Sequence, residues 1–168
     1  MRIRMKCIDL IILSLIVTVC GCSSHRTNPS GLINKEASLT GDLPFQPLRW
    51  KVVTSAVNQQ DSTISTLYGN DLAVNCARTN ASCSYPPGSV LALVAWSQQE
   101  DEHWFGAKIP ARVKSIEFIV VNSTASGEPS YSYDDYTGAP LAKLPAQEDA
   151  AVKARLAYIL GQRASVMP

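Results

Sequence analysis

The stretch from Ser89 to Trp96 constrains the fold more than any other part of the chain. It reads Ser-Val-Leu-Ala-Leu-Val-Ala-Trp and directly follows Pro86-Pro87-Gly88, which predicts a turn. A strand with one face in water alternates apolar and polar residues, whereas this run is apolar at every position after Ser89. We therefore predict a central strand that is covered on both faces.

The surrounding segments predict an antiparallel sheet. Their β-branched and aromatic residues, several of them alternating with polar ones, predict further strands at residues 50–57, 62–68, 103–109, 113–121 and 131–136. A polar loop is expected at 97–102, and Pro110 is expected to end the strand that precedes it. Including the central strand, the sheet should have about five or six strands.

Two helices are expected beside this sheet. Asn70 can cap a short central helix that ends near Arg78. A second helix is predicted for residues 146–160, because one set of apolar residues recurs at the spacing of a helical face: Val152, Leu156, Ile159 and Leu160. Together these elements predict an α+β fold, a single domain with a short central helix and an amphipathic C-terminal helix.

The first 21 residues resemble a bacterial lipoprotein signal peptide. Basic residues precede a short apolar run that ends near Val19, and small residues then lead to Cys22. The alternative is a transmembrane helix, but that needs about 20 apolar residues, and this shorter run also contains Asp9. We therefore predict a signal peptide at 1–21 and a lipid anchor (palmitate) on Cys22. Because Ser23 follows, the expected location is the outer membrane of the bacterial cell envelope, facing the periplasm.

The mature chain is expected to divide into a tether and a domain. Residues 22–44 are rich in Ser, Gly, Asn and Thr without apolar periodicity, which predicts a flexible tether, and 45–168 remain as the domain. Cleavage removes three basic residues and one acidic residue, so the formal net charge falls from +1 to −1. This charge favours neither nucleic acid nor a polybasic contact with anionic lipid. The lipid anchor is therefore the expected link to the membrane.

Cys76 and Cys83 are predicted to form a disulfide. They are the two cysteines left once Cys22 carries lipid, and disulfides persist in an oxidising compartment. Two independent thiols, one of them buried on a helix, are the alternative. No metal site is predicted here, because no His, Asp or Glu lies nearby at the spacing of zinc ligands.

Few residues of the domain indicate catalysis. His103 is its only histidine and belongs to no catalytic motif, which favours a structural role over a ligand or proton-handling role. The aromatic residues of neighbouring predicted strands, Tyr131 and Tyr136 among them, either form the core or line one apolar cavity between sheet and helix. The candidates for lining such a cavity are Trp96, His103, Trp104, Phe105, Phe118 and Tyr133.

Three segments, taken in order, resemble the cytochrome P-460 family. They are Ser65 to Asp71, Tyr85 to Val90, and His103 to Pro110, and the likeness extends over about residues 48–160. The resemblance implies a small antiparallel sheet with flanking helices, commonly assembled as a homodimer. It also implies a periplasmic relative that oxidises hydroxylamine with a c-type haem.

Two haem hallmarks of that family are missing from this chain. Covalent attachment requires a C-x-x-C-H motif, yet no cysteine follows Cys83, and the position of the family's crosslinking lysine falls near Leu93. We therefore expect no cofactor, and a non-enzymatic lipoprotein that binds a small apolar ligand or a partner protein. The alternatives are an oxidoreductase with non-covalent haem on His103 and a structural envelope protein that dimerises.

Overall fold

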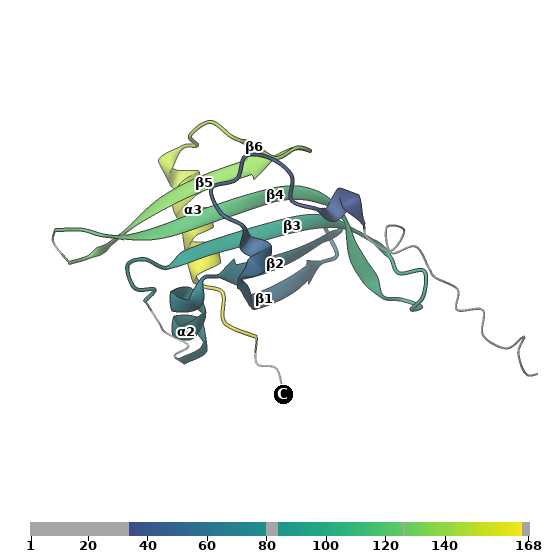
Figure 1. The fold of residues 1–168 in the computed structure, drawn as a ribbon, viewed down its shortest axis with the longest axis horizontal. Coiled ribbons are helices and arrows are strands. Elements are labelled where there is room, and N and C mark those ends of the chain that lie inside the picture. The colour runs from purple at the N-terminus through teal and green to yellow at the C-terminus, as the bar shows by residue number, and fades with distance from the viewer. Residues whose placement is uncertain (1–33, 80–83, 126, 166–168) are drawn as a thin grey trace, which may run out of the picture. The chain divides into compact units, whose positions relative to one another are not determined.

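The structure, a computed structural model, describes residues 34–79, 84–125 and 127–165 (Figure 1). The elements in chain order are η2 (Lys35–Ala37), η3 (Pro47–Arg49), β1 (Lys51–Asn58), β2 (Thr63–Gly69), α2 (Asp71–Thr79), β3 (Val90–Glu100), β4 (Lys108–Ser123), β5 (Pro129–Thr137), β6 (Ala142–Lys143) and α3 (Asp149–Leu160). The strands form one antiparallel sheet in the order β1-β2-β3-β4-β5-β6. The predicted α+β fold is confirmed; the short strand β6 was not expected.

The predicted central strand lies in β3, between β2 and β4. Side chains alternate between the two faces of a strand. Leu91 and Leu93 therefore pack on the face that also contacts α2 and α3, while Val94 and Trp96 pack on the opposite face. All four are buried, which is why the sequence of this strand is apolar on both faces.

Helices cover one face of the sheet, and a different kind of segment covers the other. Residues 34–50, which we call the N-terminal strap, cross the face opposite α3 (Figure 1). The tether was predicted to continue to residue 44, so compact structure begins earlier than predicted. Ala37, Leu39 and Leu43 pack against the buried cluster of the sheet, and the Trp96 indole nitrogen donates to the Ala37 carbonyl oxygen at 2.8 Å.

Gly41 fixes the strap to the edge of the sheet at Leu141, the residue before β6. Gly41 forms a parallel bridge with Leu141, and the Leu141 amide donates to the Thr40 carbonyl oxygen at 2.7 Å. Gly41 has a φ of +138°, and a Cβ there would lie 2.2 Å from the Leu141 carbonyl oxygen. Only glycine fits this close approach between the two backbones.

Both predicted helices are present. The Asn70 side-chain oxygen accepts from the Ala73 amide at 3.1 Å, which is the predicted N-terminal cap of α2. Helix α3 begins at Asp149, three residues later than predicted, and Ile159 on its inner face is fully buried. Leu156 and Leu160 pack against the same cluster, so the predicted apolar face is the buried one.

The prediction for residues 97–110 was wrong in three places. β3 continues through the polar residues to Glu100, and the segment 103–107 is a turn, so β4 begins only at Lys108. Polar side chains are tolerated because this end of the hairpin is exposed, and Lys108 pairs with Glu100. Pro110 does not end the strand, because it lies beside a register shift and beyond the stretch of β4 that pairs with β5.

Candidate functional site

A buried polar network connects the sheet to α3. Glu117 lies on β4 and its side chain is only 8% exposed. The Arg155 guanidinium binds this carboxylate with two nitrogens, Nε at 2.9 Å and Nη2 at 2.5 Å. The Tyr133 hydroxyl on β5 donates to the same carboxylate at 2.6 Å. Three elements therefore meet at one charge-assisted cluster.

Strand and helix periodicity bring these groups together. Glu117 lies two residues before Ile119 on β4, so both point toward the helices. On α3, Arg155 lies three residues after Val152 and four before Ile159, so it occupies the buried face of the helix. Each charged residue thus stands where the local pattern requires an apolar one, and the two compensate each other.

The network shifts the protonation equilibria of its members. Burial, together with the hydrogen bond to Glu117, raises the pKa of the Tyr133 hydroxyl, so this group stays protonated. The hydrogen bond to Glu117 raises the pKa of Arg155, which stays charged. Burial, and next the negative charge of Glu117, raise the pKa of Asp135 above its ordinary value of 3.8.

A polar pocket of about 320 Å³ opens beside this network, between β5 and the segment that enters α3. It is lined by Tyr131, Tyr133, Asp134, Asp135, Lys143, Leu144, Pro145, Ala146, Gln147, Asp149 and Val152. Its polar side chains bind one another: Lys143 pairs with Asp134 at 2.6 Å, and Gln147 donates to Asp135 at 3.1 Å. This internal pairing favours a structural role for the pocket.

Asp135→Asn is expected to stabilise the protein near pH 7, by no more than about 1 kcal/mol because solvent screens this partly exposed group. The folded-state pKa of Asp135 is raised, so the folded protein holds this proton more tightly than the unfolded chain does, and stability falls as pH rises above 3.8. Urea unfolding should show equal stability of the two proteins at about pH 3 and a difference that grows toward about pH 7.

Asp134→Asn is the matched control for this pH dependence. Asp134 is the adjacent residue and lines the same pocket, but its partner is the exposed Lys143. Loss of the pair between Asp134 and Lys143 should lower the free energy of unfolding by less than about 1 kcal/mol. Equal stability of Asp135→Asn and wild type from pH 3 to 7 would refute the role assigned to Asp135.

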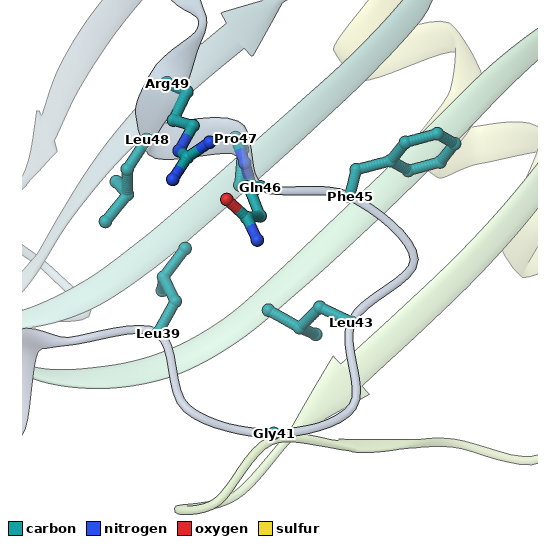
Figure 2. Close-up of a pocket in the computed structure, with 8 residues that line it drawn as sticks. All are labelled: Leu39, Gly41, Leu43, Phe45, Gln46, Pro47, Leu48 and Arg49. Carbon is teal, nitrogen blue, oxygen red and sulfur yellow. The ribbon is translucent and has the colours of Figure 1, made fainter.

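A second pocket, also of about 320 Å³, lies within the N-terminal strap (Figure 2). Its lining residues are Leu39, Gly41, Leu43, Phe45, Gln46, Pro47, Leu48 and Arg49. Figure 2 shows Leu39, Leu43 and Gln46 pointing into the space that the strap encloses, whereas Phe45 turns away from it. Leucine side chains share this lining with the polar Gln46 and Arg49, so the pocket offers both apolar and polar contacts to a small molecule.

Aromatic contacts hold the strap pocket against the sheet. The ring centroids of Phe45 and Phe118 are 5.6 Å apart, and Phe45 is also 5.6 Å from Trp50. Tyr136 meets Phe118 edge to face at 5.7 Å. Phe118 on β4 therefore anchors the strap, because its ring packs against Phe45 of the strap.

The structure does not bring the six candidate cavity residues together between sheet and helix. Trp96 and Phe118 lie in the cluster under the strap, whereas Tyr133 lies on the helix side. His103, Trp104 and Phe105 are in the turn between β3 and β4, where their side chains are exposed. Because side chains alternate between the two faces of a strand, Tyr133 lies on the face opposite Trp96 and Phe118. The other three candidates are in a turn and not in a strand.

Several functional candidates were missed from the sequence. Part of the strap pocket, from Leu39 to Leu43, falls in the segment predicted as a tether, although these two leucines were an apolar signal within it. Glu117 and Arg155 were also missed. Each is an ionisable residue within an otherwise apolar face, which is the signal that could have paired them.

The cysteine predictions fall largely outside the described residues. Cys22 and Cys83 are both outside them, so the lipid anchor and the disulfide stay predictions. Cys76 is buried on α2, and its Sγ lies 3.5 Å from the carbonyl oxygen of Ser84, the neighbour of Cys83 in sequence. Within the described ranges, no three His, Cys, Asp or Glu side chains are grouped as a metal site would require. In those same ranges no helix has the length and apolar character to cross a membrane.

A family model described as cytochrome P460 matches residues 48–154, which is more than half of the chain. No curated protein matches the chain. The matched region contains the whole sheet and the start of α3, while most of the strap pocket precedes it.

Proposed function

Because the chain belongs to the cytochrome P460 family, we propose that it is a lipid-anchored envelope protein whose P460 domain lacks covalent haem and binds a small apolar ligand in the strap pocket. The observation that carries this proposal is the strap pocket itself. Leu39, Leu43 and Leu48 give it an apolar lining, and Gln46 and Arg49 add polar groups at one side. Such a pocket suits an apolar molecule with one polar end.

The cysteine and histidine residues of the chain support the proposal that haem is not covalently attached. Attachment requires two thiols and a histidine in the order C-x-x-C-H, and the sequence has no such motif. Among the described residues the only histidine is His103, whose side chain is 83% exposed at the turn after β3 and lines neither pocket. These residues do not fit the haem of the family's founding type.

The anchor and the location rest on the N-terminal sequence. Basic residues, a short apolar run and small residues precede Cys22 in the order that a lipoprotein signal needs. Lipid on Cys22 would hold the domain at the periplasmic face of the outer membrane, because acyl chains contribute about 0.8 kcal/mol per buried methylene. The domain would then present the strap pocket to molecules in the periplasm.

Replacing Leu43 by Asn is expected to weaken binding of the neutral apolar dye N-phenyl-1-naphthylamine at least about tenfold, because it places a polar amide in a small apolar lining. The dye's fluorescence rises on entering an apolar site, so a titration of the full chain gives its affinity. Leu72→Asn on α2 is the matched control, since Leu72 is an exposed leucine that lines neither pocket. Dye bound elsewhere on the chain is the same in both variants.

Two outcomes of these titrations would contradict the proposal. Equal dye affinity in Leu43→Asn and Leu72→Asn would remove the strap pocket as the ligand site. Haem added to the purified chain should give no Soret band from bound haem. A tight haem complex that disappears in His103→Ala would instead favour an oxidoreductase with non-covalent haem.

A further inference from the structure

The turn between β3 and β4 presents two aromatic side chains to solvent. Trp104 is 72% exposed, and Phe105 is fully exposed at 109%. We call these two residues the aromatic tip. The two adjacent rings form an apolar surface that removal from water would stabilise.

The turn holds the aromatic tip in a defined conformation. The Ala107 amide donates to the Trp104 carbonyl oxygen at 3.0 Å, and Gly106 has a φ of +78°. This places Phe105 and Gly106 at the two central positions of a tight turn in which glycine supplies the positive φ. The Asp101 amide also bonds to the Ala107 carbonyl oxygen at 3.0 Å. The tip is therefore presented by an ordered hairpin.

The described chain enters the domain beside this hairpin. The Asn34 side-chain amide donates to the carbonyl oxygens of Pro110 and Ala111, at 3.1 and 2.7 Å. Two residues later, Glu36 accepts from the Arg112 guanidinium at 3.2 Å. Figure 1 shows η2 at the base of the hairpin formed by β3 and β4.

The length of the intervening chain puts the aromatic tip within reach of the membrane. Asn34 follows Cys22 by twelve residues, which can span at most about 40 Å. Phe105 precedes Ala111 by six residues, which span at most about 20 Å. A domain attached through Cys22 can therefore place the tip on the bilayer that holds its anchor.

We propose that the aromatic tip enters the headgroup region of a zwitterionic bilayer, the one to which Cys22 is attached. This inference rests on the proposed anchor and adds a second, protein-made contact. Trp and Phe favour the membrane interface, where an apolar ring is covered while polar groups stay hydrated. The adjacent charges decide the lipid class: Glu100, Asp101 and Glu102 precede the tip, and Lys108 pairs with the first of them. This local acidity disfavours an anionic surface.

Quenching of tryptophan fluorescence by brominated lipid tests the inference. The full chain is reconstituted into phosphatidylcholine vesicles with bromine on the acyl chain near the headgroup. Trp104 is one of three tryptophans; Trp96 is buried in the sheet under the strap, and Trp50, the last residue of the strap, packs against the same cluster. We expect at least twofold stronger quenching in wild type than in Trp104→Phe. Phe105→Ser should reduce the quenching, while Val57→Ser, a change at another exposed apolar residue, should leave it unchanged.

A separate measurement distinguishes failure of the inference from failure of the proposed anchor. Incorporation of labelled palmitate by expressing cells, and its loss in Cys22→Ser, reports the anchor alone. If palmitate is incorporated but Trp104 is not quenched, the tip inference is wrong and the anchor stands. Shielding of Trp104 from aqueous acrylamide without quenching by brominated lipid would also overturn it, because another protein surface would then cover the tip.

Discussion

Replacing Arg155 by Met is expected to lower the free energy of unfolding by about 3 kcal/mol. The substitution keeps an apolar stem of similar length on α3 but removes both nitrogens that bind Glu117. The Glu117 carboxylate is then left buried with Tyr133 as its remaining donor. The Arg155 side chain is 41% exposed, so water can replace part of the lost contact, which places the cost at the lower end of the range for a broken buried pair.

A double-mutant cycle separates the ion pair from simple loss of packing. In the Arg155→Met background, Glu117→Gln should recover at least about half of the loss, because it removes the unpaired charge. Lys153→Met on the same helix is the control, since Lys153 is exposed, and it should change stability by less than about 0.5 kcal/mol. Urea unfolding measures wild type, Arg155→Met, Glu117→Gln and the double variant, which complete the cycle, together with Lys153→Met. A cost below about 1 kcal/mol for Arg155→Met would show that the pair does not hold α3 to the sheet.

The sheet and helices could be predicted because their signals are local. The apolar run of β3 and the helical spacing of Leu156 and Ile159 each follow from burial of a repeating face. The tip of the hairpin could not be predicted in this way. Trp104 and Phe105 have the composition of a strand, yet their position in a turn depends on how far the polar residues up to Glu100 extend β3.

The candidate sites were harder to predict because they depend on distant pairs. The strap is fixed by contacts such as Trp96 with Ala37, 59 residues apart, and Asn34 with Pro110, 76 residues apart. Nothing in the strap's own sequence specifies these partners. Glu117 and Arg155 are likewise 38 residues apart, so neither shows its partner locally.

Replacing Phe118 by Ala is expected to lower the free energy of unfolding by about 4 kcal/mol and to weaken the attachment of the strap. Phe118 is only 2% exposed and is among the largest fully enclosed side chains of the core. Its ring contacts Phe45 of the strap and Tyr136 of β5. Truncation removes both contacts and leaves a cavity that the surrounding packed side chains close only in part.

The readout for the strap must differ from global stability, because a less stable sheet alone would not show that Phe118 anchors it. Hydrogen exchange of the Leu141 amide, which bonds to Thr40 of the strap, should accelerate in Phe118→Ala more than the amides that pair β2 with β3. Phe118→Leu, which keeps more of the volume, should cost less on both measures. Phe45→Ala should accelerate Leu141 exchange in the same way, because it removes the strap's half of the contact. If exchange at Leu141 follows global stability in every variant, the strap is held by its backbone bonds rather than by the aromatic contact, and the ligand pocket does not depend on Phe118.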